Sequence, residues 1–154
     1  NDIYVGDKKL AGILIEHKLQ GSEIGRTIAG IGLNVNQMEF SPDLPNPVSM
    51  QQLTRVELDT EEVLRRVVEA VMARYEMLRQ GGEQQIQEDY QELLYRRDAL
   101  HWYFLPDGKR FRGTIRGVEP SGALRVENEK GEERSYQFKE IEFSVKNITK
   151  YTED

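Results

Sequence analysis

The sequence of 154 residues contains no cysteine and only two histidines. The lack of cysteine excludes disulfide bonds, thiolate catalysis and zinc sites built on cysteine, and we expect a cytoplasmic protein. The two histidines, His17 and His101, are far apart in the sequence and lack metal-ligand spacing, so a zinc site is not expected either. No run of about 18 apolar residues and no signal-peptide pattern is present, which argues against a membrane span.

Net positive charge is also lacking, because 21 lysines and arginines stand against 27 aspartates and glutamates, for a net charge of −6. General nucleic-acid binding favours basic stripes, so the chain is not predicted to bind nucleic acid by itself. Apolar residues make up 38% of the sequence, which over 154 residues suffices for one or two small domains with a modest core.

Residues 1–36 are the most informative stretch of the chain. Residues 3–5 are β-prone, a Gly-Asp turn follows, and residues 9–19 predict a second strand. The region therefore predicts a hairpin with Lys8 and Lys9 at its bend. Two adjacent lysines on a bend are usually solvated, but they are also the first candidates for binding an anion.

A third strand is predicted over residues 24–35, and it is unusual in its glycines. Gly30 and Gly32 lie inside it, and Asn34 and Asn36 stand at its end. Glycine inside a strand often marks a bulge or a close approach of a ligand to the backbone. A lysine, closely spaced glycines and amide side chains together predict a pocket for an anionic, planar ligand.

The middle of the chain has helical periodicity. A proline-rich loop over residues 41–47 leads to a short helical turn over 48–53. Asp59 is the predicted N-cap of a helix that ends at Gly81-Gly82, and a second helix is predicted over 83–94. The first of these helices has an apolar stripe that we expect to pack on a sheet. The stripe consists of Val63, Leu64, Val67, Val68, Val71, Met72, Tyr75 and Leu78.

Near residue 98 the period changes from helical to alternating, and we place a boundary there between a domain of residues 1–98 and a domain of residues 99–154. Short apolar runs with turn signals between them predict five strands in the second domain, and the chain end is expected to be frayed. The strands cover residues 100–105, 110–118, 123–128, 133–138 and 141–145, and the frayed end covers 151–154. Five short strands at such intervals predict a small antiparallel barrel.

Three segments within residues 1–36 together resemble one enzyme family. They are Asn1-Asp2, then Lys8-Lys9-Leu10-Ala11-Gly12-Ile13-Leu14-Ile15-Glu16, and then Gly30-Ile31-Gly32-Leu33-Asn34-Val35-Asn36. In this order and spacing they resemble the second half of the catalytic domain of biotin protein ligase, the biotin–[acetyl-CoA-carboxylase] ligase. In that family a Trp-Pro-Asn-Asp segment precedes Lys-x-x-Gly-Ile-Leu-x-Glu, and Gly-Ile-Gly-x-Asn-x-Asn follows.

The resemblance implies an α+β fold in two parts. Residues 1–98 are expected to form an antiparallel or mixed sheet with helices, as the C-terminal part of the catalytic domain. Residues 99–154 are expected to form the SH3-like barrel that follows that domain in many biotin protein ligases. Asn1 stands without the Trp-Pro of its motif, and the Gly/Arg-rich loop that holds biotin in this family is missing. We therefore expect a truncated or cleaved chain that is inactive by itself.

The resemblance also implies a two-step reaction that uses ATP, biotin and Mg²⁺. The biotin carboxylate attacks the α-phosphate of ATP, which gives biotinoyl-5′-adenylate and pyrophosphate. A lysine of the biotin carboxyl carrier protein of acetyl-CoA carboxylase then attacks the adenylate. Lys9 matches the family lysine that stabilises the charge on the phosphoryl oxygens, so it is the expected catalytic residue. Magnesium is expected to be held largely by the nucleotide and water.

Further residues match nucleotide-binding positions of the family. Asn1 and Asn34 match positions near the adenine and ribose, Gly12 lets the backbone approach the adenylate, and Gly30 and Gly32 line the same wall. Without the resemblance, turn caps and a simple bulge would explain these residues. The second asparagine at the strand end is a weaker candidate. The expected cofactor-binding set is Asn1, Lys9, Gly12, Gly30, Gly32 and Asn34.

Two other functions remain open at this point. One is a non-catalytic interaction module whose barrel binds a partner, and the other is a lipoate ligase, which uses the same adenylate chemistry. Partners of biotin protein ligases include a second copy of the enzyme in some members, and DNA in members with an N-terminal helix-turn-helix. A homodimer is therefore an open alternative, and nucleic acid is expected as a partner only through a domain that this sequence does not contain.

Overall fold

The structure is a computed structural model that describes residues 1–137 and 139–143. It contains two compact units, Asn1–Ala70 and Val71–Asp154. The division falls inside a helix, so the domain boundary expected near residue 98 stays a prediction. Within the described part of the chain, no helix is long and apolar enough to span a membrane.

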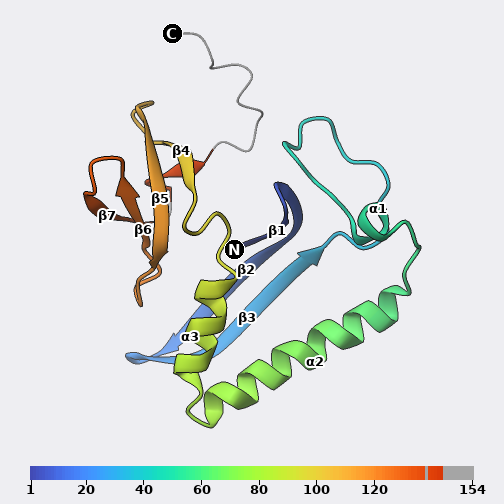
Figure 1. The fold of residues 1–154 in the computed structure, drawn as a ribbon. Coiled ribbons are helices and arrows are strands. Elements are labelled where there is room, and N and C mark those ends of the chain that lie inside the picture. The colour runs from blue at the N-terminus through green and yellow to red at the C-terminus, as the bar shows by residue number, and fades with distance from the viewer. Residues whose placement is uncertain (138, 144–154) are drawn as a thin grey trace. The chain divides into compact units, whose positions relative to one another are not determined.

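The first unit is built on a three-stranded antiparallel sheet with the order β1-β2-β3 (Figure 1). Its strands are β1 (Asp2–Val5), β2 (Lys8–Gln20) and β3 (Glu23–Leu33). Gly6 and Gly21 lie in the two connecting turns with positive φ values of 57° and 67°, which glycine adopts without a steric cost. The hairpin predicted at the start of the chain and the third strand are confirmed.

The register of β2 and β3 places different residue types on the two faces of this sheet. Pairs such as Ile13 with Ile31 and Ile15 with Ala29 give one face an apolar character. The alternate pair, Gly12 with Gly32, places glycine on the opposite face. One face of the sheet is therefore apolar, and on the other face Gly12 and Gly32 leave the backbone without side chains near β1.

The segment after β3 is connected by hydrogen bonds to the short helix α1 (Met50–Thr54). Ser49 caps this helix in a capping box, because its side chain accepts from the amide of Gln52 while the Gln52 side chain accepts from the Ser49 amide. Val48 and Ser49 are both buried, so the start of α1 is packed firmly into the first unit.

Helix α2 (Thr60–Arg79) begins where the sequence predicts. The Asp59 carboxylate accepts hydrogen bonds from the amides of Glu61 at 2.9 Å and Glu62 at 3.4 Å, which confirms Asp59 as the N-cap. The expected packing of the apolar stripe is wrong, because α2 has no buried residue and Leu64 is 63% exposed. Periodicity predicts an apolar face correctly, but it does not establish that another element covers that face.

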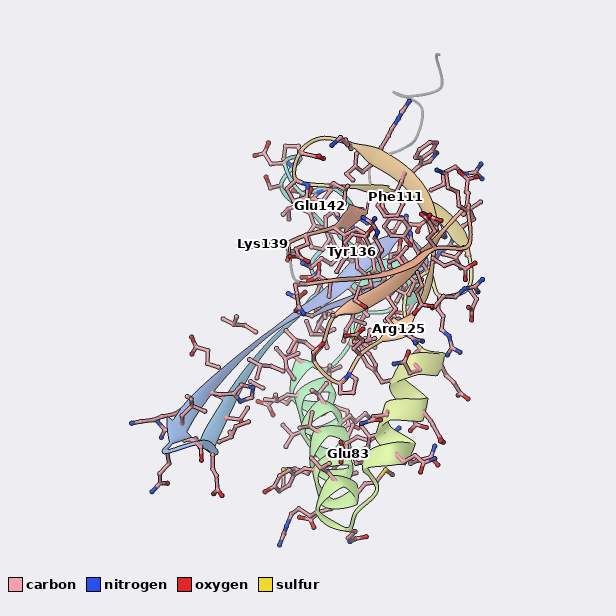
Figure 2. The ribbon with its side chains drawn as sticks, turned by 90° about the vertical axis from the view of Figure 1, so that its left-hand side faces the viewer. Glu83, Phe111, Arg125, Tyr136, Lys139 and Glu142 are labelled. Carbon is pink, nitrogen blue, oxygen red and sulfur yellow. The ribbon has the colours of Figure 1, made fainter. Side chains whose placement is uncertain are left out.

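The second unit contains α3 (Glu83–Glu92) and a five-stranded antiparallel sheet with the order β7-β6-β5-β4-β8. The strands are β4 (Leu100–Phe104), β5 (Arg110–Val118), β6 (Leu124–Asn128), β7 (Glu133–Tyr136) and β8 (Glu142–Phe143). Tyr103, Ile115 and Val126 form its buried core. Phe111 and Tyr136 stack at its border with ring centroids 5.8 Å apart (Figure 2).

The predicted fold class is confirmed, since two antiparallel sheets and helices follow one another in the expected order. All five predicted strands of the C-terminal half are present. Parts of the strand predicted over 133–138 and of the one predicted over 141–145 lie outside the described residues, as does the expected frayed end at 151–154. The SH3-like form of the barrel stays a prediction.

Candidate functional site

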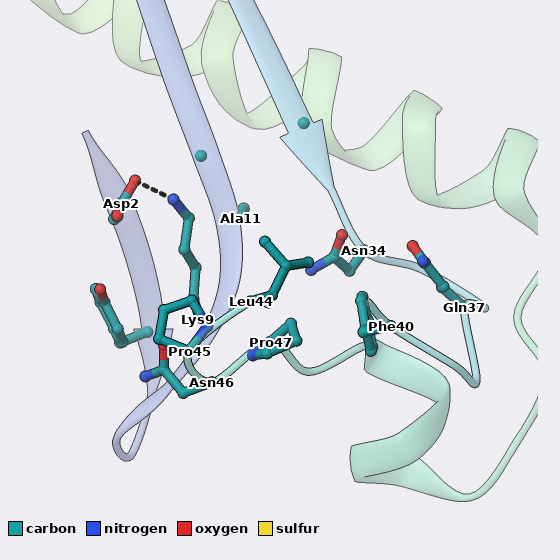
Figure 3. A pocket seen from close by; sticks show the side chains of 13 residues that line it. Asp2, Lys9, Ala11, Asn34, Gln37, Phe40, Leu44, Pro45, Asn46 and Pro47 are labelled. Atoms are coloured by element: carbon teal, nitrogen blue, oxygen red, sulfur yellow. Dashed lines mark ion pairs between the residues drawn. The ribbon is translucent and has the colours of Figure 1, made fainter. Parts of the chain in front are cut away.

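A pocket of about 310 Å³ lies within the first unit, on the glycine side of the sheet (Figure 3). The strands and the long segment between β3 and α1 line it together. The lining residues are Asp2, Tyr4, Lys9, Ala11, Gly12, Gly32, Asn34, Gln37, Phe40, Leu44, Pro45, Asn46 and Pro47. Four of the six residues expected to bind nucleotide, Lys9, Gly12, Gly32 and Asn34, are therefore brought together.

A bulge in β2 places Lys9 in this pocket. Ile3 pairs with Ala11 and Tyr4 pairs with Lys9, so Leu10 is an extra residue on β2. Because strand side chains alternate between faces, the extra residue turns Lys9 to the same face as Gly12. Without the bulge, the lysine side chain would point to the opposite, apolar face of the sheet.

An ion pair fixes the ammonium group of Lys9. Its Nζ lies 2.8 Å from Oδ1 of Asp2, and both side chains remain partly open to solvent (Figure 3). Asp2 faces Gly12 across β1 and β2, so the carboxylate and the lysine share one corner of the pocket. A cation held in place beside an open cavity can receive an anionic group of a ligand without further ordering.

Gly12 and Gly32 form the floor of the pocket. A Cβ built on Gly12 would stand 3.6 Å from the Lys9 ammonium and 3.6 Å from the Asp2 carboxylate. These are ordinary contact distances, so the fold itself does not require glycine at this position. A methyl group there would instead take up space in the pocket next to the lysine. Glycine at this position therefore leaves that space in the pocket open.

Residues 37–47, which we call the pocket loop, form the opposite wall, and the sequence analysis did not identify them as part of a site. Phe40, Leu44 and Pro45 give this wall apolar surface, and Gln37 and Asn46 add amides. The proline spacing predicted a loop but not its position against the sheet. That position depends on contacts between residues far apart in the sequence, which no local pattern encodes.

The two ends of the pocket loop are fixed to the sheet. At its C-terminal end, the amide of Lys9 donates to the Asn46 carbonyl at 2.8 Å, and the amide of Val48 donates to the Lys9 carbonyl at 2.9 Å. These bonds form an isolated parallel bridge between Lys9 and Pro47. Lys9 thus supplies the ammonium group to the pocket with its side chain and binds the end of the pocket loop with its backbone.

Asn34 has a structural contact in addition to its place in the pocket. Its side-chain nitrogen donates to the Val48 carbonyl at 3.1 Å, so the carboxamide oxygen is the atom it offers to a ligand. Asn1 and Gly30 are not among the lining residues. The Asn1 carbonyl accepts a hydrogen bond from the amide of Ile13 at 2.7 Å. The binding roles of all these residues stay predictions.

The described residues contain no group of three or more His, Asp or Glu side chains that could hold a metal ion. Among the described residues, Asp2 is the one carboxylate that lines the pocket, and it is engaged with Lys9. This donor set suits a magnesium ion that is coordinated mainly by phosphate oxygens and water, and it does not suit a metal bound by protein ligands alone.

Comparison with known proteins supports the resemblance noted in the sequence. No family model matches the chain. The chain is similar to the bifunctional ligase/repressor BirA of Bacillus spizizenii, with 28% identity over an alignment that covers 88% of this chain and 42% of that protein. It is also similar to the protein of the same name from Salmonella typhimurium, with 26% identity, 84% of this chain and 40% of that protein.

The fold is that of a solved biotin protein ligase. The crystal structure of the enzyme from Aquifex aeolicus matches with a TM-score of 0.72 and 20% identity over 94% of this chain and 62% of that chain. The same enzyme in complex with biotin and ATP matches with a TM-score of 0.71 and 20% identity over 94% of this chain and 60% of that chain. The resemblance to biotin protein ligases is confirmed, and the chain spans less than half the length of the BirA proteins.

Proposed function

We propose that this chain is the C-terminal part of a biotin protein ligase and supplies the nucleotide side of its active site. The observation that carries the proposal is the corner formed by Lys9, Asp2 and the Gly12–Gly32 floor, in a chain similar over most of its length to named ligases. The complete enzyme would activate biotin with ATP and transfer it to a lysine of a biotin carboxyl carrier protein.

Lys9 is the residue of this chain that acts on the reacting phosphate in this proposal. When the biotin carboxylate attacks the α-phosphorus, a P–O bond forms and the bond to pyrophosphate breaks, and negative charge develops on the phosphoryl oxygens. The ammonium group lowers the energy of that state more than the energy of the bound substrates. In the transfer step the same group stabilises the leaving adenylate phosphate.

The pocket loop and Asn34 fit the remaining parts of a nucleotide. The surface of Phe40 and Leu44 suits a planar ring, and the carboxamide oxygen of Asn34 can accept a hydrogen bond from a sugar hydroxyl or an amino group. Magnesium would enter with the ATP phosphates. Together with Lys9, it would neutralise part of the negative charge of the phosphates.

The test is biotin transfer by the complete protein that contains this chain. With ATP, magnesium and the carrier domain of acetyl-CoA carboxylase, the complete protein should increase the mass of the carrier by one biotinoyl group in intact-protein mass spectrometry, and lipoic acid in place of biotin should give no product. Transfer of lipoic acid but not biotin would replace the proposal by a lipoate ligase. No transfer of either acid would support a non-catalytic interaction module.

The 154-residue chain alone should not make the adenylate in this proposal, because the Gly/Arg-rich biotin loop of the family is not among its residues. The same assay with the isolated chain checks this expectation. Production of biotinoyl-5′-adenylate by the isolated chain would contradict it and would require a biotin site within these residues.

A further inference from the structure

The carboxamide of Asn36 makes two hydrogen bonds to the backbone of one distant residue. Its nitrogen donates to the Leu58 carbonyl at 2.7 Å, and its oxygen accepts from the Leu58 amide at 3.0 Å. The two residues are 22 positions apart, and Leu58 directly precedes the N-cap of α2. Both ends of the carboxamide are therefore engaged, and Asn36 is not among the residues that line the pocket.

Asn36 stands immediately before the pocket loop. A second side chain fixes the loop two residues later in the sequence, where the nitrogen of Gln52 donates to the Met38 carbonyl at 2.8 Å. The oxygen of the same side chain completes the capping box of α1. Because the far end of the loop is fixed by the bridge between Lys9 and Pro47, the loop is held at its start and at its end.

We propose that Asn36 is a positioning residue that keeps the pocket loop in its binding position before any nucleotide arrives. This inference rests on the proposed function and adds to it a residue that acts without touching the ligand. The two hydrogen bonds between the Asn36 carboxamide and the Leu58 backbone, which we call the amide clamp, would raise the fraction of molecules whose pocket wall is formed. The apparent dissociation constant of a ligand is the intrinsic constant divided by that fraction, so a preformed wall strengthens binding.

The variant that tests the clamp is Asn36→Asp. Aspartate has the same shape and keeps the acceptor for the Leu58 amide, but its carboxylate replaces the donor and faces the Leu58 carbonyl. Asn36→Ser removes the clamp without adding a charge and serves as the second variant. Asn128→Asp is the matched control. Its side chain also accepts backbone amides, those of Lys130 and Glu132, but in a turn of the other unit.

The experiment measures hydrogen exchange of peptides from the pocket loop in the complete protein, with and without ATP, together with the kinetics of biotin transfer. Without ATP, both Asn36 variants should exchange faster in residues 37–47, and saturating ATP should restore protection. The KM for ATP should rise roughly tenfold with kcat within about twofold, since two side-chain hydrogen bonds are lost while the catalytic groups remain. Asn128→Asp should leave loop exchange and the KM for ATP unchanged.

Loop exchange that is the same in the wild type and in both variants would overturn the proposal. An increase in exchange spread over β1, β2 and β3 would also overturn it, because it would show a general structural role. Failure of the proposed function gives a different pattern. In that case wild-type loop peptides would gain no protection from ATP, although the Asn36 variants would still exchange faster without ligand.

Discussion

The three-stranded sheet β1–β3 and the five-stranded sheet β4–β8 differ in where their apolar side chains lie. In the five-stranded sheet, Tyr103 and Ile115 are 0% and 2% exposed and face one another in a core. In the three-stranded sheet, Ile15 is 54% exposed and Leu19 is 65% exposed. The five-stranded sheet covers its own apolar face, whereas the three-stranded sheet does so only near the pocket loop.

The glycines of the two sheets show the same difference. A Cβ on Gly113 of β5 would stand 2.6 Å from a methyl carbon of Val126, so this glycine is required by packing. A Cβ on Gly12 of β2 would have only ordinary contacts and would enter the pocket. The glycine of the five-stranded sheet thus allows close packing of a core, whereas the glycine of the three-stranded sheet lies at a candidate site. The comparison predicts separable effects on stability and on binding.

The largest stability effect should come from truncation in the core. Ile115→Ala removes a buried side chain from the five-stranded sheet and should lower the free energy of unfolding by about 2–5 kcal/mol. Ile15→Ala, in the exposed part of β2, should change it by no more than about 0.5 kcal/mol. Urea unfolding followed by Trp102, the single tryptophan and part of β4, measures the first effect, and hydrogen exchange of β2 measures the second. An equal loss of unfolding free energy in the two variants would contradict the claim that only the five-stranded sheet is stabilised by a buried core.

Alanine at the two strand glycines should give a smaller but more specific contrast. Gly113→Ala should destabilise the five-stranded sheet by roughly 1–3 kcal/mol, because the added methyl overlaps Val126. Gly12→Ala should leave the unfolding transition in place and weaken ATP binding by the complete protein. Thermal unfolding and ATP titration of both variants check this pair. Undiminished ATP affinity in Gly12→Ala would show that the glycine floor is not a ligand surface.

The smallest effect concerns the hydroxyl of Tyr103 at high pH. Burial raises the pKa of Tyr103 to about 12 from an ordinary value of 10.0, and its hydroxyl has no hydrogen-bond partner among the described residues. The phenol ionises more easily when unfolded, so the free energy of unfolding should fall as the pH rises from about 10 to about 12. Tyr103→Phe should remove this fall and change stability near neutral pH by less than about 1 kcal/mol.

Urea unfolding at several alkaline pH values, followed by Trp102 fluorescence, measures this dependence. Tyr75→Phe is the matched control, because the Tyr75 side chain is half-exposed. It should retain the alkaline fall seen in the wild type. A fall of the same size in Tyr103→Phe would show that another group causes it.

The strands and turns could be predicted from the sequence because their signals are local. Gly6 and Gly21 mark turns by the positive φ values that they adopt, and Asp59 marks a helix start by its side chain. The exposure of the α2 stripe was not predictable, since it depends on what else packs there. The same periodicity would have described a fully covered helix.

The candidate site was predictable only in part. Lys9 and Gly12 were identified through their resemblance to a family motif, but the bulge at Leu10 that brings them to one face was not. The pocket loop and the contact of Asn36 with Leu58 were missed, because both join residues that are distant in the sequence. Amides at a strand end predicted ligand contacts, whereas the Asn36 carboxamide binds backbone.

Adjacent lysines allow the most direct test of the central claim, which is that Lys9 stabilises charge on a phosphate. Lys9 lies in the pocket beside Asp2, and its neighbour Lys8 is exposed and outside the lining. The measurement is biotin-dependent exchange of pyrophosphate into ATP by Lys9→Ala and Lys8→Ala forms of the complete protein. We expect Lys9→Ala to lower the rate by about 10²–10³ and Lys8→Ala to leave it within a few-fold of the wild type. Equal rates in the two variants would contradict the account.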